Sequence, residues 1–273
     1  VLPDTIRLEG PFFESVSHWL RSGGRLIASG RSLLNAEASG FLLDFPAEVG
    51  GCSPFHPDYL RVDPSWDRDL VESPFVVYER SWRFRATGQA EPVADVHDPY
   101  FNRTWRHFCS HQHAPARPEP NGFHGILATG QMVVFAHPVF TAYERSGQPL
   151  LKYAFRGALE RLLPNPLMRT NLPSSARVFL RRQARQNRHL LHLYYAQTQL
   201  RGSGLDGLHG RQQMEILEDA VPLHEVEIDL RLAVTPTRAY SARSGAELAI
   251  DLSSGGCRVR LPRIDLHEVV VLE

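Results

Sequence analysis

The chain has 273 residues, and its hydrophobic content of 42% and charged content of 22% are those of an ordinary globular protein. Its 30 basic and 30 acidic residues cancel, so net charge attracts neither nucleic acid nor an anionic membrane. No apolar run approaches the roughly 20 residues that a membrane-spanning helix needs.

The cysteines indicate a reducing environment. There are three, Cys52, Cys109 and Cys257, and they lie far apart in the sequence. An odd number without a CxxC pair does not fit a disulfide framework. Because no signal peptide opens the sequence, we expect a cytoplasmic protein.

The opening of the chain, residues 1–29, predicts a strand, a helix and a second strand. Pro11 fits the first helical turn, and Gly23 fits the left-handed end of the helix. Residues 25–29 then form a short buried strand. A helix enclosed so tightly between two strands is typical of a βαβ crossover in a parallel sheet. The apolar face of the predicted helix consists of Phe12, Val16, Trp19 and Leu20.

The next part of the chain is predicted to be less regular. Residues 30–70 contain glycines and prolines without a clear period, and we expect them to be irregular. A hairpin and a helix that ends before Pro164 follow further on. The expected elements are strands at 75–78, 82–85 and 92–96, a hairpin at 126–128 and 132–136, and a helix at 149–163.

After Pro173 the apolar period changes from that of a helix to that of a strand. Val226, Ile228 and Leu230 alternate with charged residues, which predicts a half-buried antiparallel strand. A Gly-rich turn is expected at 203–211. Several short strands of this kind favour a small antiparallel β-sandwich, so we divide the chain into domains 1–165 and 166–273. The other strands are expected at 188–196, 248–252, 257–261 and 269–272.

A long polar and aromatic loop begins at Asp98, and it holds the densest group of functional side chains. If its second half were extended, three imidazoles and the thiol of Cys109 would share one face and could bind zinc. Two other interpretations are a loop whose polar groups satisfy one another, and a loop that faces a sugar by ring stacking and hydrogen bonding. The candidate residues are Tyr100, Asn102, Arg103, Trp105, His107, His111 and His113.

Three histidines outside this loop have to be interpreted separately. His137 follows a predicted strand, where α/β proteins often bind ligands, so it joins the candidate substrate-facing residues. A hydrogen-bonded histidine of the core is the alternative. His189 and His192 lie within an apolar strand and are interpreted as structural.

No catalytic motif accompanies these residues. The sequence lacks a G-x-S-x-G elbow, a P-loop, an H-E-x-x-H motif and a dinucleotide-binding glycine pattern. Cys52 follows two glycines, and a thiol hydrolase that uses Cys52 or Cys109 stays as a minor alternative. The acidic pairs Glu225/Glu227 and Glu215/Glu218 are interpreted as solvated charge.

Two segments resemble known proteins. The segment LRSGGRLIASG at residues 20–30 resembles the trimerisation domain of bacterial β-galactosidases, a flavodoxin-like domain of the glutamine amidotransferase type that lacks the nucleophile. The segment PYFNRTWRHFCSHQH at residues 99–113, together with residues 137–140 and the β-rich tail, resembles glycoside hydrolases with an N-terminal (β/α)8 barrel. Some relatives of that architecture are α-L-fucosidases.

The resemblance implies a fold and a function. It implies an incomplete flavodoxin-like α/β domain, without its first strands, followed by the antiparallel β-sandwich. The catalytic carboxylates would lie in the barrel, which is not in this chain, so this chain alone is expected to be inactive and to need no cofactor or metal. The leading hypothesis is an accessory and oligomerisation region, whose loop at 98–113 closes over the sugar site of its own or a neighbouring subunit. The alternative is a carbohydrate-binding or structural assembly module.

Overall fold

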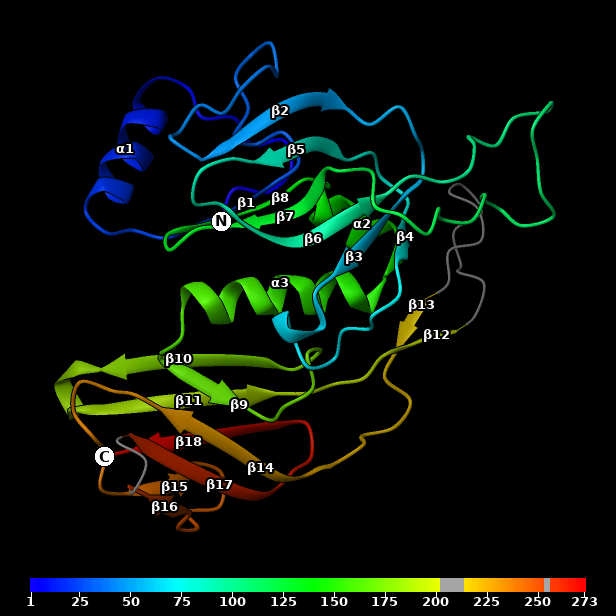
Figure 1. The fold of residues 1–273 in the computed structure, drawn as a ribbon. Coiled ribbons are helices and arrows are strands. Elements are labelled where there is room, and N and C mark those ends of the chain that lie inside the picture. Colours follow the sequence, from blue (N-terminus) through cyan, green and yellow to red (C-terminus); the bar gives the residue numbers. More distant parts are fainter. Residues whose placement is uncertain (202–213, 253–255) are drawn as a thin grey trace, which may run out of the picture. The chain divides into compact units, whose positions relative to one another are not determined.

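The computed structural model describes residues 1–201, 214–252 and 256–273 (Figure 1). The chain divides into two compact units, Val1–Pro164 and Asn165–Glu273. Among the described residues, no helix is long and apolar enough to cross a membrane.

The first unit is built around one curled sheet that forms half a barrel (Figure 1). Its main order is β1-β8-β7-β6-β3-β4, while β5 pairs with β7 and β2 pairs with β5. The β1–β8 pair is parallel, and the other strand pairs are antiparallel. The strands are β1 (Leu26–Ser29), β2 (Ala47–Cys52), β3 (Asp58–Val62), β4 (Phe75–Val77), β5 (Trp82–Ala86), β6 (Glu91–His97), β7 (His124–Ala128) and β8 (Met132–Phe135).

Apolar residues cover both faces of this sheet. On one face pack α2 (Val139–Ser146) and α3 (Pro149–Leu162), which contribute buried residues such as Leu151 and Ala158. The short 3-10 helix η1 (Pro64–Trp66) packs on the same side. On the other face lie α1 (Gly10–Arg21) and the segment 31–45.

Of the strand, helix and second strand predicted for residues 1–29, the helix and the second strand are present, and the first strand is shorter than expected. Helix α1 is present with Pro11 in its first turn, but its apolar face is only partly the predicted one: Val16 and Leu20 pack on the core, while Phe12 and Trp19 are exposed. The strand expected before it is a single parallel bridge from Leu2 to Ala28 of β1. The strands expected between residues 75 and 97, the hairpin at 126–136 and the helix at 149–163 are also present.

The predicted fold class, a flavodoxin-like α/β domain followed by a β-sandwich, is wrong, because the structure is mostly β and its first sheet is largely antiparallel. Residues 30–70 are not irregular, since β2 and β3 lie there. The pairing of β2 with β5 shifts register between Val49 and Cys52, and Gly50-Gly51 at this bulge have low strand propensity, which hid that strand. Helix α2 was missed because its start, Val139-Phe140-Thr141, has strand-like propensity.

The second unit contains two four-stranded antiparallel sheets around one apolar core. The predicted alternation of residues 226–230 is confirmed: Val226, Ile228 and Leu230 of β14 are all buried. A separate two-stranded ladder joins β12 (Gln199–Arg201) to β13 (Met214–Ile216), and the turn predicted at 203–211 lies outside the described residues. The sheet strands are β10 (Arg177–Gln183), β11 (Arg188–Tyr194), β18 (His267–Leu272) and β15 (Ala239–Ser241), and β16 (Ala249–Asp251), β17 (Cys257–Ile264), β14 (Leu223–Leu230) and β9 (Met168–Thr170).

Candidate functional site

The long polar loop leaves the sheet at the end of β6 and is closed at its base. A β-bridge joins Pro99 to Ala116, which brings the two ends of the loop together. Asp98 lies at this base, where it accepts a hydrogen bond of 2.7 Å from Asn121 and faces the guanidinium of Arg83 at 3.5 Å. The carboxylate of Asp98 is therefore a structural anchor of the loop.

His113 holds the returning arm of the loop between two tyrosines. Its Nδ1 lies 3.2 Å from the hydroxyl of Tyr78, and its ring meets the rings of both Tyr59 and Tyr78 edge-on. The Tyr59 hydroxyl donates a bond of 2.6 Å to the carbonyl of Ala114, and burial, followed by the neighbouring Tyr78 and Cys109, raises the Tyr59 pKa. The sequence analysis singled out neither tyrosine, because Tyr59 lies in the segment predicted to be irregular and Tyr78 lies at the end of a predicted strand.

Two more of the candidate residues also fasten the loop. The Asn102 amide donates to the carbonyl of Pro54 at 2.8 Å and accepts from the backbone N–H of His56 at 2.9 Å. The Arg117 guanidinium lies 5.6 Å from the ring centre of Tyr100. These contacts hold the first arm of the loop against the segment around Pro54 and against Arg117.

The tip of the loop, in contrast, is open to solvent. The Trp105 side chain is 81% exposed and that of Phe108 is 71% exposed. The guanidinium of Arg106 stacks on the Trp105 ring at 4.6 Å, which keeps a charged and aromatic surface in place. Arg103, His107 and His111 are exposed as well. A tip with large exposed rings on a fastened base is suited to contact a ligand or another protein surface.

The structure does not assemble the zinc site that the sequence allowed. No strand runs through residues 100–115, so the side chains do not alternate as that interpretation requires. The thiol of Cys109 turns toward the backbone carbonyls of His111 and His113. Within the part of the chain that is described, no three His, Cys, Asp or Glu side chains are placed to hold a metal ion.

His137 lies in a different environment from the loop. Its side chain is completely buried, and Nε2 lies 2.5 Å from a carboxylate oxygen of Asp58. The Ser81 hydroxyl donates to the other oxygen of Asp58, which is also completely buried. The structure therefore places His137 in a polar cluster inside the first unit, separate from the exposed tip.

The thiol and carboxylate groups considered for catalysis have other surroundings. Cys52 ends β2 opposite Trp82, and no helix follows it directly, so the strand–turn–helix of a nucleophile elbow is absent there. Glu227 is bound by Arg260, with 3.0 Å between Oε1 and Nε. Arg258 donates to Asp229 and thereby lowers the pKa of that carboxyl. Glu215, Glu218 and Glu225 are exposed.

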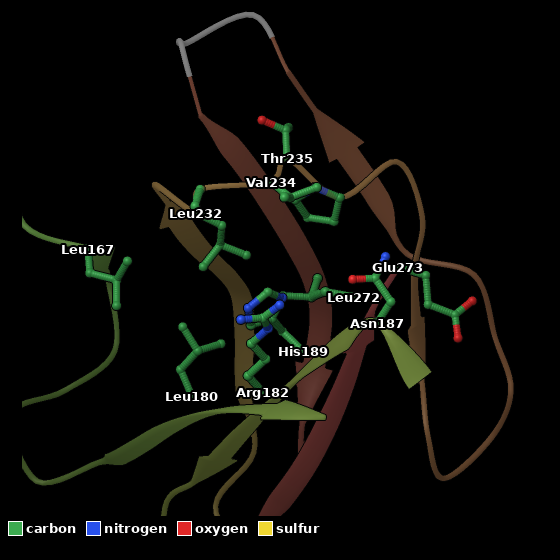
Figure 2. Close-up of a pocket in the computed structure, with 12 residues that line it drawn as sticks. Leu167, Leu180, Arg182, Asn187, His189, Leu232, Val234, Thr235, Leu272 and Glu273 are labelled. Atoms are coloured by element: carbon green, nitrogen blue, oxygen red, sulfur yellow. The ribbon is translucent and has the colours of Figure 1, made fainter. Parts of the chain in front are cut away.

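A hollow with aliphatic walls lies in the second unit (Figure 2). It has a volume of about 400 Å³. Figure 2 shows Leu167, Leu180 and Leu232 around the side chains of Arg182 and His189. No carboxylate pair lines this hollow, in which Glu273 is the acidic residue, so it does not have the two acids that hydrolysis of a glycosidic bond requires.

Comparison with known proteins gives a solved structure that is similar to this chain over its whole length. No protein-family model matches the sequence, and no curated protein matches it. The similar structure is the α-L-fucosidase isoenzyme 2 from Paenibacillus thiaminolyticus, with a TM-score of 0.90 and 34% sequence identity. The match covers 100% of this chain and 40% of the fucosidase. The chain is thus related to a glycoside hydrolase but spans less than half of its length.

Proposed function

We propose that this chain is an accessory region of a glycoside hydrolase of the α-L-fucosidase kind, and that hydrolysis takes place in another part of the parent protein. The supporting observation is the likeness to the Paenibacillus fucosidase, which extends over all of this chain. Because the match covers 40% of the fucosidase, more than half of that protein has no counterpart here. That remainder is large enough for a (β/α)8 barrel, which would supply the catalytic carboxylates.

The surroundings of Asp67 and Asp69, two acids close together in this chain, support the proposal that hydrolysis takes place elsewhere in the parent protein. A glycosidase needs one carboxyl group whose pKa is raised, so that it can protonate the leaving oxygen. Asp67 and Asp69 instead both bind Arg156. Although burial alone would raise the pKa of Asp67, the hydrogen bonds from Arg156 and from the Asp69 backbone lower it. The Asp67 carboxylate is thus kept ionised, and both acids serve as salt-bridge partners of Arg156.

The loop at 98–113 is the part of this chain that contacts the carbohydrate. Its fastened base and exposed tip support this role, since Trp105 can stack on the apolar face of a sugar while Arg103, His107 and His111 donate hydrogen bonds to hydroxyls. The tip lies over the barrel's sugar site, in the same subunit or in a neighbouring copy of a homo-oligomer.

Steady-state kinetics on an aryl α-L-fucoside test this function. The chain of 273 residues alone is expected to release no phenol above buffer. In the parent protein, replacing Trp105, His107 and His111 together by alanine is expected to raise KM by roughly tenfold, as stacking and hydrogen bonds are lost. The matched control is Phe12→Ala, another exposed aromatic residue, which is expected to leave KM unchanged.

Two outcomes would contradict the proposal. Turnover by the isolated chain would show that the catalytic acids lie in this chain. Unchanged kinetics of the triple variant would show that the loop does not contact the sugar. Light scattering on the same variant distinguishes the two positions of the loop. A smaller particle than the unmodified parent protein would indicate that the tip reaches a neighbouring subunit.

A further inference from the structure

The outer face of one sheet in the second unit carries a group of rings that the loop site does not include. Strand register places Phe179 of β10 opposite His192 of β11, and Tyr194 of β11 opposite His267 of β18. Because side chains alternate along a strand, these four lie on the face opposite to the buried residues Leu191 and Leu193. The four rings therefore form a continuous surface over three adjacent strands.

This surface is hollowed into a shallow groove. The groove has a volume of about 530 Å³ and is lined by five residues: Phe179, Arg181, His192, Tyr194 and His267. Phe179 is 53% exposed and Tyr194 is 47% exposed, so both present ring area to solvent. The imidazoles of His192 and His267 stack on each other, with 5.8 Å between the ring centres and an angle of 15° between the planes.

The polar groups of the groove are not used by their neighbours. Among the described residues, the side chains of Arg181, His192 and His267 and the Tyr194 hydroxyl have neither a hydrogen bond nor a salt-bridge partner. Arg181 alone offers five N–H donors. The groove therefore combines apolar ring surface with free hydrogen-bonding groups, which together match the flat C–H faces and the hydroxyls of a sugar.

Its composition and size favour a carbohydrate over a protein partner. The hollow around Leu180 combines leucine, valine and proline with polar residues such as Arg182 and His189, whereas the groove contains no aliphatic residue. A stable protein interface needs about 20–30 residues on each side, many more than the five that line this groove. A few rings with one or two hydrogen-bonding groups are sufficient for a short stretch of a sugar chain.

We propose that this groove binds a carbohydrate chain. Phe179 and Tyr194 stack on successive sugar rings, and Arg181 and the two imidazoles donate hydrogen bonds to hydroxyl groups. Sequence reasoning assigned His192 a structural role, because the strand around it is strongly apolar. The site does not depend on the proposed function, since binding is measured on the chain itself without turnover.

Saturation-transfer NMR followed by calorimetry on the 273-residue chain tests the site. The probes are cellohexaose, mannohexaose, xylohexaose and 2′-fucosyllactose, and at least one is expected to bind. Phe179→Ala and Tyr194→Ala are each expected to weaken that binding by roughly three- to tenfold, because one stacking ring is lost. Tyr194→Phe keeps the ring and is expected to stay within about twofold of the unmodified chain.

Two controls distinguish a loss of affinity caused by a missing stacking ring from one caused by a damaged fold. Tyr143→Ala removes an aromatic side chain of similar exposure in the first unit and is expected to leave the affinity unchanged. Circular dichroism and the unfolding midpoint are compared for all variants, and alanine variants that bind weakly while folded support the site.

Three results would overturn the proposal. The first is the absence of saturation transfer to every probe. The second is an equal loss of affinity in Tyr143→Ala. The third is a chain that self-associates, binds no probe and becomes monomeric in light scattering when Phe179 and Tyr194 are replaced by alanine. That result would identify the groove as an interface between copies.

Discussion

The buried pair of Asp58 and His137 shows how a residue's surroundings decide its role. Both side chains have no exposed surface, and with the Ser81 hydroxyl they form a buried polar cluster, in which Nδ1 of His137 has no hydrogen-bond partner among the described residues. A charged or polar group without water is stable only while its partners remain in place. The cluster therefore ties the start of β3 to the segment that follows β8.

His137→Ala is expected to destabilise the chain by about 3 kcal/mol or more, because the Asp58 carboxylate would lose a partner inside the core. His111→Ala, a change at an exposed histidine of the loop, is expected to stay within about 0.5 kcal/mol. Urea unfolding followed by circular dichroism measures both. If His137→Ala kept the midpoint of the unmodified chain, the structural role of the cluster would be wrong.

At the scale of elements, α3 is held against η1 by a close contact. The indole N–H of Trp66 donates to the carbonyl of Ala154 at 2.9 Å. A Cβ atom added at Gly157 would lie 2.4 Å from a ring carbon of Trp66 and 2.6 Å from the Trp66 carbonyl oxygen. Glycine at this position thus lets the helix approach η1, although glycine is a poor helix former.

Gly157→Ala tests this contact, because helix propensity and packing predict opposite signs. Propensity alone would stabilise the helix by about 1 kcal/mol. We expect overpacking to exceed that gain and to leave the variant about 1–3 kcal/mol less stable. Gly130→Ala is the control, since a Cβ there meets nothing within 4 Å and is expected to be neutral. A stabilised Gly157→Ala chain would show that α3 can move away from Trp66.

The sequence predicts elements well where one period is long and unbroken. The alternation in β14 was visible because that strand has a single buried side, whereas only Val16 and Leu20 of the predicted face of α1 pack on the core, together with Phe13. In β2 and α2 local propensity does not agree with the observed structure. A bulge interrupts strand β2, and helix α2 begins with β-branched and aromatic residues, which favour strands. Long-range pairing decides such segments, and a single sequence does not contain it.

At the scale of the whole molecule, each unit has its own apolar interior. The second unit encloses one core between its two sheets, with residues such as Ile228 and Leu193 at 0% exposure. The first unit needs α3, because Leu151, Ala154 and Ala158 complete the core on one face of its sheet. Each unit thus has its own hydrophobic core, which is the main requirement for a unit to fold by itself.

Separate expression of residues 1–164 and 165–273 is expected to yield two fragments that each unfold cooperatively on heating. A fragment of residues 1–147 lacks α3 and is expected to be partly unfolded, because the core beneath that helix would be exposed to water. Calorimetry and near-ultraviolet circular dichroism measure these states. A cooperative transition of 1–147, or none for 165–273, would contradict this division.

The sequence by itself determined which segments are apolar on one side and which loop collects the reactive side chains, because these depend on spacing and composition. Only the tertiary structure decided that the first sheet is largely antiparallel and curled, that His137 is enclosed with Asp58, and that Phe179, Tyr194 and His267 share one groove. The physical reason is the same in each case. Hydrogen bonding between strands joins residues that are far apart in the sequence, such as Tyr194 and His267, which are 73 positions apart, and local preferences do not encode such partners.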